Sequence, residues 1–214
     1  MLAAALLTIM VGGLSVRLGP RWPRRVFFRA PAGIVIHHTA TGAYVKGRRV
    51  DADLISEWHE HRGWGAEYRG EDFHIGYHYV ILPDGTVQAG RPEWMRGAHA
   101  RGHNDFLGVC LVGNFDPDSN PAGDQQPDRP SDAQLDALVG LLRDLVTKYR
   151  LTTGDIYRHS DLGATACPGE RFPMEEVIRR VKENGSAANT SGGIQRGYRE
   201  RASGTLACVI LQPS

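Results

Sequence analysis

The feature that most constrains the fold of this chain is a continuous apolar run, FLGVCLVGNF, at residues 106–115. A run of this length and composition is typical of a strand in the interior of a β-sheet. A second apolar run, GIVIHHTATG at 33–42, ends in polar residues and predicts a strand that finishes in a turn. The two runs therefore predict a sheet at the centre of the molecule.

Helical spacing of apolar residues predicts the elements that pack against this sheet. Three stretches have this pattern, at 50–64, 131–149 and 172–184. In the first, Asp51 or Asp53 is the expected N-cap and Gly63 the stop, and in the second Ser131 is the expected N-cap. Pro173 lies near the start of the third, where a proline is well tolerated.

The order of these elements predicts the fold class. Residues 73–91 form an expected β-hairpin, because two β-rich runs flank the turn sequence PDGT. The chain then reads strand, helix, hairpin, strand, helix, loop, helix, which predicts an α/β domain with a central mixed β-sheet flanked by helices. We expect an apolar leader and basic linker at 1–30, the folded domain at 31–184 and a flexible C-terminal tail at 185–214.

The leader, MLAAALLTIMVGG, and the overall charge bear on location and partners. The apolar run is shorter than the roughly 20 residues of a membrane span, and it lacks the basic start of a signal peptide although it has the length of a signal core. It is interpreted as a signal or a weak membrane anchor, with a packed or disordered leader as the alternative. We therefore expect an exported (periplasmic or extracellular) or membrane-tethered protein. A net charge of +1 predicts no nucleic-acid partner.

Two residues that could bind a metal occur close together in RHSDLGATACPG at 158–169, namely His159 and Cys167. The chain has three cysteines, and this small, odd number does not suit a disulfide framework. Cys110 lies within the apolar run and is expected to be a buried small hydrophobe. Only Cys167 has the polar, turn-forming neighbours that suit chemistry.

The third ligand is sought in the histidine pair that ends the first strand. Successive strand side chains point to opposite faces, so only one of His37 and His38 can face a given metal. His37, His159 and Cys167 would form a His₂Cys set that suits Zn²⁺ and leaves a fourth position for water, the pattern of a catalytic site. The alternatives are a core histidine at 37 and an inert loop cysteine at 167.

Five motifs in order then match a known family. They are IVIHHTA, IGYHYVILPDGTVQAGR, GAHARGHN, LVGNF and RHSDLGATACPG. Together the motifs resemble the zinc-dependent N-acetylmuramoyl-L-alanine amidases of type 2, which share a fold with the peptidoglycan recognition proteins and the phage amidase lysozymes. The resemblance covers residues 33 to about 180.

The resemblance implies an activity and the residues that perform it. The implied reaction is hydrolysis of the amide between N-acetylmuramic acid and the L-alanine of the peptidoglycan stem peptide. The implied zinc ligands are His37, His159 and Cys167, with Tyr77 near the zinc-bound water and Thr165 assisting at the reacting carbonyl. Phage members often carry lysine in place of Thr165, whereas active animal recognition proteins carry threonine. A related branch that recycles cytoplasmic anhydro-muropeptides usually has aspartate where this chain has Cys167.

Four further residues are candidate contacts to a peptidoglycan or muropeptide substrate. His38 and Thr39 follow the first ligand and are expected either to contact the muropeptide or to make structural hydrogen bonds. His99 and Asn104 resemble groove residues, with loop stabilisation as the alternative. The alternative function is a non-catalytic peptidoglycan-binding module on the same fold, which Cys167 disfavours because recognition-only members commonly lack it. We expect a monomer, and a cytoplasmic phage-type enzyme is the alternative to export.

Overall fold

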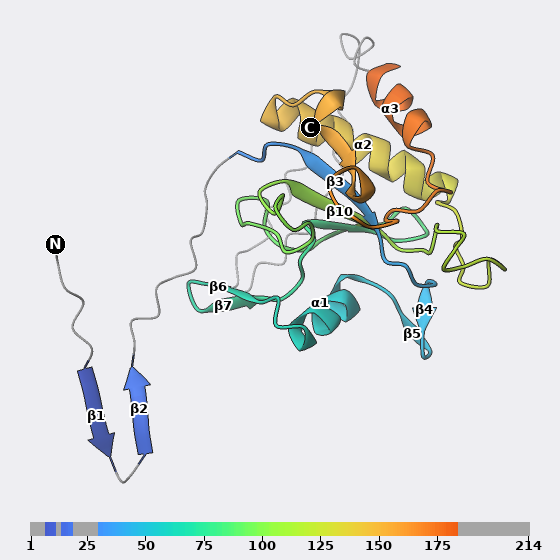
Figure 1. Ribbon diagram of the computed structural model, residues 1–214. Helices are drawn as coiled ribbons and strands as arrows, with labels where there is room; N and C mark the ends of the chain where they lie inside the picture. The colour runs from blue at the N-terminus through green and yellow to red at the C-terminus, as the bar shows by residue number, and fades with distance from the viewer. Residues whose placement is uncertain (1–6, 12–13, 19–29, 184–214) are drawn as a thin grey trace, which may run out of the picture.

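A five-stranded mixed sheet forms the centre of the protein in the computed structural model, which describes residues 7–11, 14–18 and 30–183. Its strands are β3 (Ile34–His38), β8 (Tyr79–Ile81), β9 (Val87–Ala89), β10 (Leu107–Leu111) and β11 (Ile156–Arg158). The spatial order is β11-β3-β10-β8-β9, and Figure 1 shows β3 and β10 side by side within it. All neighbours are parallel except β8 and β9, which are antiparallel. The predicted mixed sheet is confirmed.

The strands arise where the apolar runs predict them. β10 lies within the run at 106–115, and each of its five residues is buried. It is the middle strand, hydrogen-bonded to β3 on one side and to β8 on the other. The hairpin predicted at 73–91 supplies β8 and β9. β11 is a three-residue edge strand, too short to be recognised by periodicity.

Helices cover both faces of the sheet. They are α1 (Ala52–His61), α2 (Asp132–Tyr149) and α3 (Met174–Glu183), with short 3₁₀ turns η1 (Thr153–Asp155) and η2 (His159–Asp161). Asp51 caps α1 by accepting a hydrogen bond from the Leu54 amide, and Ser131 forms a capping box with Gln134 at the start of α2. In Figure 1, α2 and α3 lie on one side of the sheet and α1 on the other.

Alternate residues of the strands divide the core in two. The larger cluster joins the sheet to α2 and α3, and includes Ile34, Ile36, Leu107, Val109, Leu138 and Leu142. The smaller cluster lies on the α1 face and includes Leu54, Ile55, Val80 and Val112. Because side chains alternate along a strand, His37 belongs to the α1 face together with Val35.

Two small hairpins flank the sheet and were not predicted. They are β4 (Tyr44–Val45) with β5 (Arg48–Arg49), and β6 (Ala66–Tyr68) with β7 (Glu71–Phe73). The segment of β6 and β7 is polar and shows no alternation, so its pairing depends on tertiary contacts. The buried guanidinium of Arg91 supplies them by donating to the carbonyls of Trp64 and Phe73.

The leader is described in part. β1 (Leu7–Val11) and β2 (Leu14–Leu18) pair with one another as antiparallel strands. The rest of 1–29 and the tail at 185–214 lie outside the described residues, so the signal or anchor and the flexible tail stay predictions. Among the residues that the structure describes, no helix has the length and apolar character needed to cross a membrane.

Candidate metal centre

The sheet itself brings His37 and His159 together. β11 and β3 are parallel neighbours, with Arg158 paired to Ile36. His37 follows Ile36 and His159 follows Arg158, so the two histidines lie side by side at the carboxyl end of these parallel strands. Their ring centroids are 4.6 Å apart. A pair far apart in sequence is thus placed by the register of two adjacent strands.

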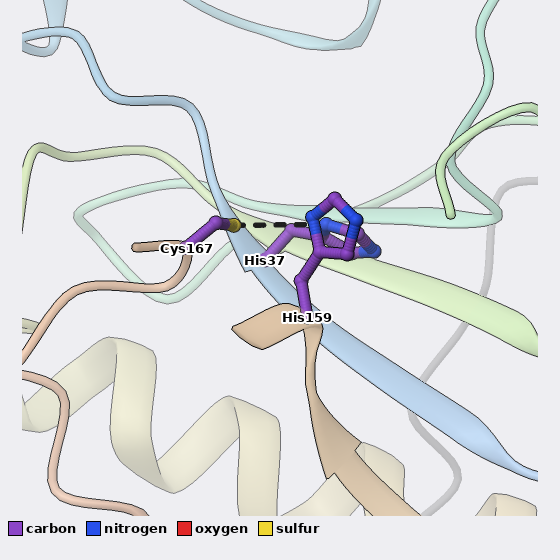
Figure 2. Close-up of side chains that lie close together, drawn as sticks. All are labelled: His37, His159 and Cys167. Carbon is purple, nitrogen blue, oxygen red and sulfur yellow. Dashed lines mark hydrogen bonds between the residues drawn. The ribbon is translucent and has the colours of Figure 1, made fainter. Parts of the chain in front are cut away.

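Cys167 reaches the same point from the loop that follows η2. The Ser160 amide donates to the Cys167 carbonyl at 2.8 Å, which folds the loop back onto its own start. The His38 amide donates to the Cys167 sulfur at 3.4 Å. Sγ of Cys167 then lies 3.7 Å from Nδ1 of His37. Figure 2 shows the three side chains converging, with this contact drawn as a dashed line.

The three side chains fit a zinc ion. One ligand atom from each of His37, His159 and Cys167 lies within 4.8 Å of the other two. Ligand atoms about 2.0–2.3 Å from a tetrahedral Zn²⁺ are separated from each other by roughly 3.5 Å. The 3.7 Å between sulfur and Nδ1 is close to that spacing. Two imidazoles and a thiol form a donor set typical of zinc, with a fourth position left over.

Burial controls the protonation of the ligands. Desolvation, followed by the neighbouring rings of His99 and His159, lowers the pKa of His37 well below its ordinary value. Desolvation also lowers the pKa of His159. Both rings are therefore held neutral, as a metal ligand requires. Burial raises the pKa of the Cys167 thiol to about 12, opposed by the His38 amide. A bound cation would reverse this last effect, because coordination deprotonates a thiol.

Tyr77 and Thr165 both lie at this centre. The Tyr77 ring centroid is 5.1 Å from that of His37, and its hydroxyl is hydrogen-bonded to the Cys110 thiol. Burial raises the pKa of Tyr77 well above its ordinary value, so the hydroxyl keeps its proton. Thr165 is exposed, and its oxygen accepts from the Cys167 amide at 3.2 Å. Because Thr165 accepts in this bond, its own hydroxyl hydrogen stays available as a donor.

His38 and Thr39 are engaged in structural hydrogen bonds. The His38 ring lies on the other face of β3 from His37, where its Nδ1 accepts from the Phe115 amide at 3.1 Å. The Thr39 hydroxyl donates to the Gly113 carbonyl and accepts from the Gly113 amide, at 3.2 and 3.1 Å. For both residues, these contacts favour a structural role over a contact to the muropeptide.

His99 and Asn104 lie in the loop before β10, and the His99 ring contacts the centre directly. Nδ1 of His99 is 3.0 Å from Nε2 of His37, and Nε2 of His99 is 3.0 Å from the Phe106 carbonyl oxygen. Burial lowers the pKa of His99 to about 3. The Asn104 side-chain oxygen accepts from the backbone amides of His99 and Ala100, so it supports the loop that carries His99.

Two residues near the centre were not predicted to contribute to it. Cys110 is fully buried, as expected, but it is also the register partner of His37 and a hydrogen-bond partner of Tyr77. His59 of α1 accepts from the Gly76 amide at 2.8 Å and packs against the Tyr77 ring. Strand register would have identified Cys110, whereas His59 depends on how α1 docks.

The domain that carries this centre is similar to known proteins. Residues 27–170 match the family model described as N-acetylmuramoyl-L-alanine amidase. The chain is 37% identical to the endolysin of Klebsiella phage KP32 over 136 residues, which span 63% of this chain and 78% of that protein.

Solved structures extend the similarity to the whole domain. The endolysin N-acetylmuramoyl-L-alanine amidase LysCS from Clostridium intestinale URNW superposes with a TM-score of 0.59 and 32% identity, covering 77% of this chain and 92% of the other. A mutant of Drosophila PGRP-LB in complex with tracheal cytotoxin superposes with a TM-score of 0.51 and 28% identity, covering 73% and 87% of the two chains.

Proposed function

The chain belongs to the N-acetylmuramoyl-L-alanine amidase family, and from that premise we propose that it hydrolyses its substrate with a zinc ion held by His37, His159 and Cys167. The bond cut is the amide between N-acetylmuramic acid and the L-alanine of the peptidoglycan stem peptide. The observation that carries the zinc proposal is the convergence of three ligand atoms within 4.8 Å from β3, η2 and the loop after it.

The ion and the surrounding side chains have different roles in the hydrolysis. When bound, Zn²⁺ supplies Lewis acidity, which lowers the pKa of a coordinated water toward about 7 and polarises a carbonyl. Hydrolysis adds the oxygen of water to the carbonyl carbon, breaks the C–N bond and leaves a proton on the alanine nitrogen. We assign Tyr77 the role of orienting the attacking water, because its hydroxyl keeps its proton and its ring packs against His37.

Thr165 is proposed to assist at the reacting carbonyl. Its oxygen accepts from the Cys167 amide, which fixes the side chain beside the ligand sulfur and leaves its hydrogen free to donate. A hydrogen bond from Thr165 would stabilise the negative charge that develops on the carbonyl oxygen. A neutral hydroxyl supplies less stabilisation than the charged ammonium of a lysine would, because hydrogen bonds from charged donors are roughly twice as strong.

The proposed substrate is peptidoglycan or a muropeptide, as the family description and the peptidoglycan recognition proteins among the structural neighbours support. The apolar leader at 1–30 is proposed to serve as a signal or anchor that brings the enzyme to this substrate. N-terminal sequencing of the mature protein tests this part of the proposal, since an intact Met1 in the soluble cytoplasmic fraction would contradict it.

The decisive experiment compares Cys167→Ala with wild type for bound zinc and for release of dye from labelled cell walls. We expect the variant to lose both, because two histidines alone bind zinc weakly. Mass spectrometry of the wild-type products should find stem peptides with a free L-alanine amino group, which identifies the bond. Cys208→Ala is the matched control, because it also removes one thiol but from a residue that is not among the proposed ligands.

Two results would overturn the proposal in different ways. A Cys167→Ala protein with full zinc content and full hydrolysis would show that the ligand set is wrong. A zinc-loaded wild type that binds cell walls and releases no product would show that the chain is a binding module.

A further inference from the structure

His37 has one nitrogen directed at the candidate metal and one directed away from it. Nδ1 faces the sulfur of Cys167 at 3.7 Å, and Nε2 faces Nδ1 of His99 at 3.0 Å. A neutral imidazole carries its hydrogen on only one of the two nitrogens. Which nitrogen carries the hydrogen therefore decides whether His37 can bind a metal beside Cys167.

The hydrogen bonds of His99 determine the answer. The Phe106 carbonyl oxygen can only accept, so Nε2 of His99, 3.0 Å away, must donate to it. An uncharged ring that donates from Nε2 has its lone pair on Nδ1, which then accepts from Nε2 of His37. His37 therefore carries its hydrogen on Nε2 and leaves the lone pair of Nδ1 directed toward Cys167.

The surroundings of His99 hold its ring in the orientation that these two hydrogen bonds need. A Cβ added at Gly108 would lie 2.6 Å from the ring, and one added at Gly97 would lie 2.5 Å from it, so the ring occupies the space that these two glycines leave. The Asn104 side chain fixes the backbone by accepting from the His99 amide at 2.8 Å. The loop therefore fixes the position of Nδ1 of His99, the atom that accepts from His37.

We propose that His99 is a positioning residue, which fixes His37 in the tautomer whose Nδ1 binds the metal. The inference rests on the zinc site proposed above and adds to it a residue that contacts the ligand His37 and is not itself a metal ligand. Without the acceptor, the hydrogen of His37 is free to move to Nδ1, where it would block coordination. Loss of such a partner in other metal sites lowers metal affinity by about 10–100-fold.

A matched pair of variants separates this role from simple packing. His99→Leu and His99→Asn have the same side-chain branching, and both remove the bond to the Phe106 carbonyl. Only asparagine places an acceptor oxygen where Nδ1 of His99 lies. We expect His99→Leu to weaken zinc binding about 10–100-fold in competition with a chelator, and His99→Asn to recover most of the loss.

Equal loss in the two variants, or wild-type affinity in His99→Leu, would overturn the proposal. Melting temperatures of both metal-free variants check that the comparison is made between folded proteins. Zinc binding by wild type tests the proposed function, whereas the difference between the two variants tests only His99.

A spectroscopic measurement needs neither variant. Long-range ¹H–¹⁵N spectra of the metal-free wild type should place the hydrogen of His37 on Nε2. A hydrogen on Nδ1 would overturn the proposal even if both His99 variants failed to fold.

Discussion

On the face of the sheet that α2 and α3 cover, β3 and β10 present Ile34, Ile36, Leu107, Val109 and Leu111, whereas on the α1 face β3 presents His37 and β10 presents Cys110. Both sets come from the same two strands and differ only in the parity of their positions. The first face packs against helices as a continuous apolar cluster. The second carries buried polar groups, each of which needs a specific partner.

The comparison teaches how the two faces divide stability and chemistry. Apolar burial is non-directional, so the α2–α3 face gains stability from almost any well-packed set. A buried imidazole is stabilising only with a hydrogen-bond partner, because an unsatisfied polar group costs roughly 1–3 kcal/mol. His59, His78 and His99 each meet this need through a backbone amide or carbonyl. The stability of the α1 face is therefore more sensitive to small displacements than that of the α2–α3 face.

The largest expected effect is on the apolar face. Ile36→Ala removes a fully buried side chain from the α2–α3 cluster and should lower the free energy of unfolding by about 2–5 kcal/mol. The variant should keep the zinc content of wild type, because Ile36 points away from the metal centre. Urea unfolding and metal analysis of the folded fraction measure the two effects.

Ile36→Val is the matched control for this prediction, with an expected cost of about 0.5–1.5 kcal/mol. Loss of zinc in both variants while stability is retained would contradict the division of roles between the faces.

An intermediate effect is expected from acid on the α1 face. Burial lowers the pKa of His59 to about 4, from an ordinary value near 6.5. The unfolded chain therefore takes up a proton at higher pH than the folded one, and stability is lost as pH falls from about 6.5 to 4. His59→Asn keeps an acceptor for the Gly76 amide and cannot titrate. Its loss of stability over this range should be smaller than that of wild type by about 2 kcal/mol.

Urea unfolding of both proteins at several pH values between 7.5 and 4 measures that difference. Because loss of a metal at low pH would affect wild type and variant alike, subtraction isolates His59. Parallel curves for the two proteins would show that His59 takes up no proton on unfolding.

The smallest expected effect concerns Glu93, a carboxylate that is partly buried beside α2. Burial raises its pKa, but hydrogen bonds from Tyr149, Tyr79 and Lys148 outweigh burial and lower it overall. Because the pKa of Glu93 is lower in the folded protein than the value near 4.3 of an unfolded chain, its charge stabilises the fold above about pH 4.3. This stability is lost as the pH falls through the pKa of the folded protein. Glu93→Gln should cost about 1 kcal/mol at pH 7, and the difference from wild type should shrink below about pH 4.

Lys148→Met is the companion control, because it removes an exposed ion pair and a cation–π contact with Tyr149, and it should cost less than Glu93→Gln. A cost of Glu93→Gln that stays constant from pH 7 to 3 would show that the charge of Glu93 contributes nothing.

The elements of the fold were predictable because their signals are local. The apolar run at 106–115 became β10, and Ser131 became the N-cap of α2, since periodicity and capping chemistry act within a few residues. The hairpin of β6 and β7 was missed for the opposite reason, because Arg91 and the carbonyls it contacts hold that segment from a distance.

The candidate site was only partly predictable. Motif order indicated His37, His159 and Cys167, but spacing alone could not choose His37 over a core histidine. His99 was expected to be a groove residue, and its contact with His37 depends on how the loop before β10 folds. Cys110 was expected to be buried, and its position opposite His37 requires the register of two strands.

By itself, the sequence determined the two central strands β3 and β10, the β8–β9 hairpin and the three helices, and it determined which residue types could form a zinc site. Both depend on local pattern and side-chain chemistry. The tertiary structure decided which nitrogen of His37 is free to bind. That choice depends on Phe106, His99 and His37 meeting at hydrogen-bond distance. Hydrogen bonds act only over such distances, and residues 37, 99 and 106 reach them through the pairing of β3 with β10 and the loop that precedes β10.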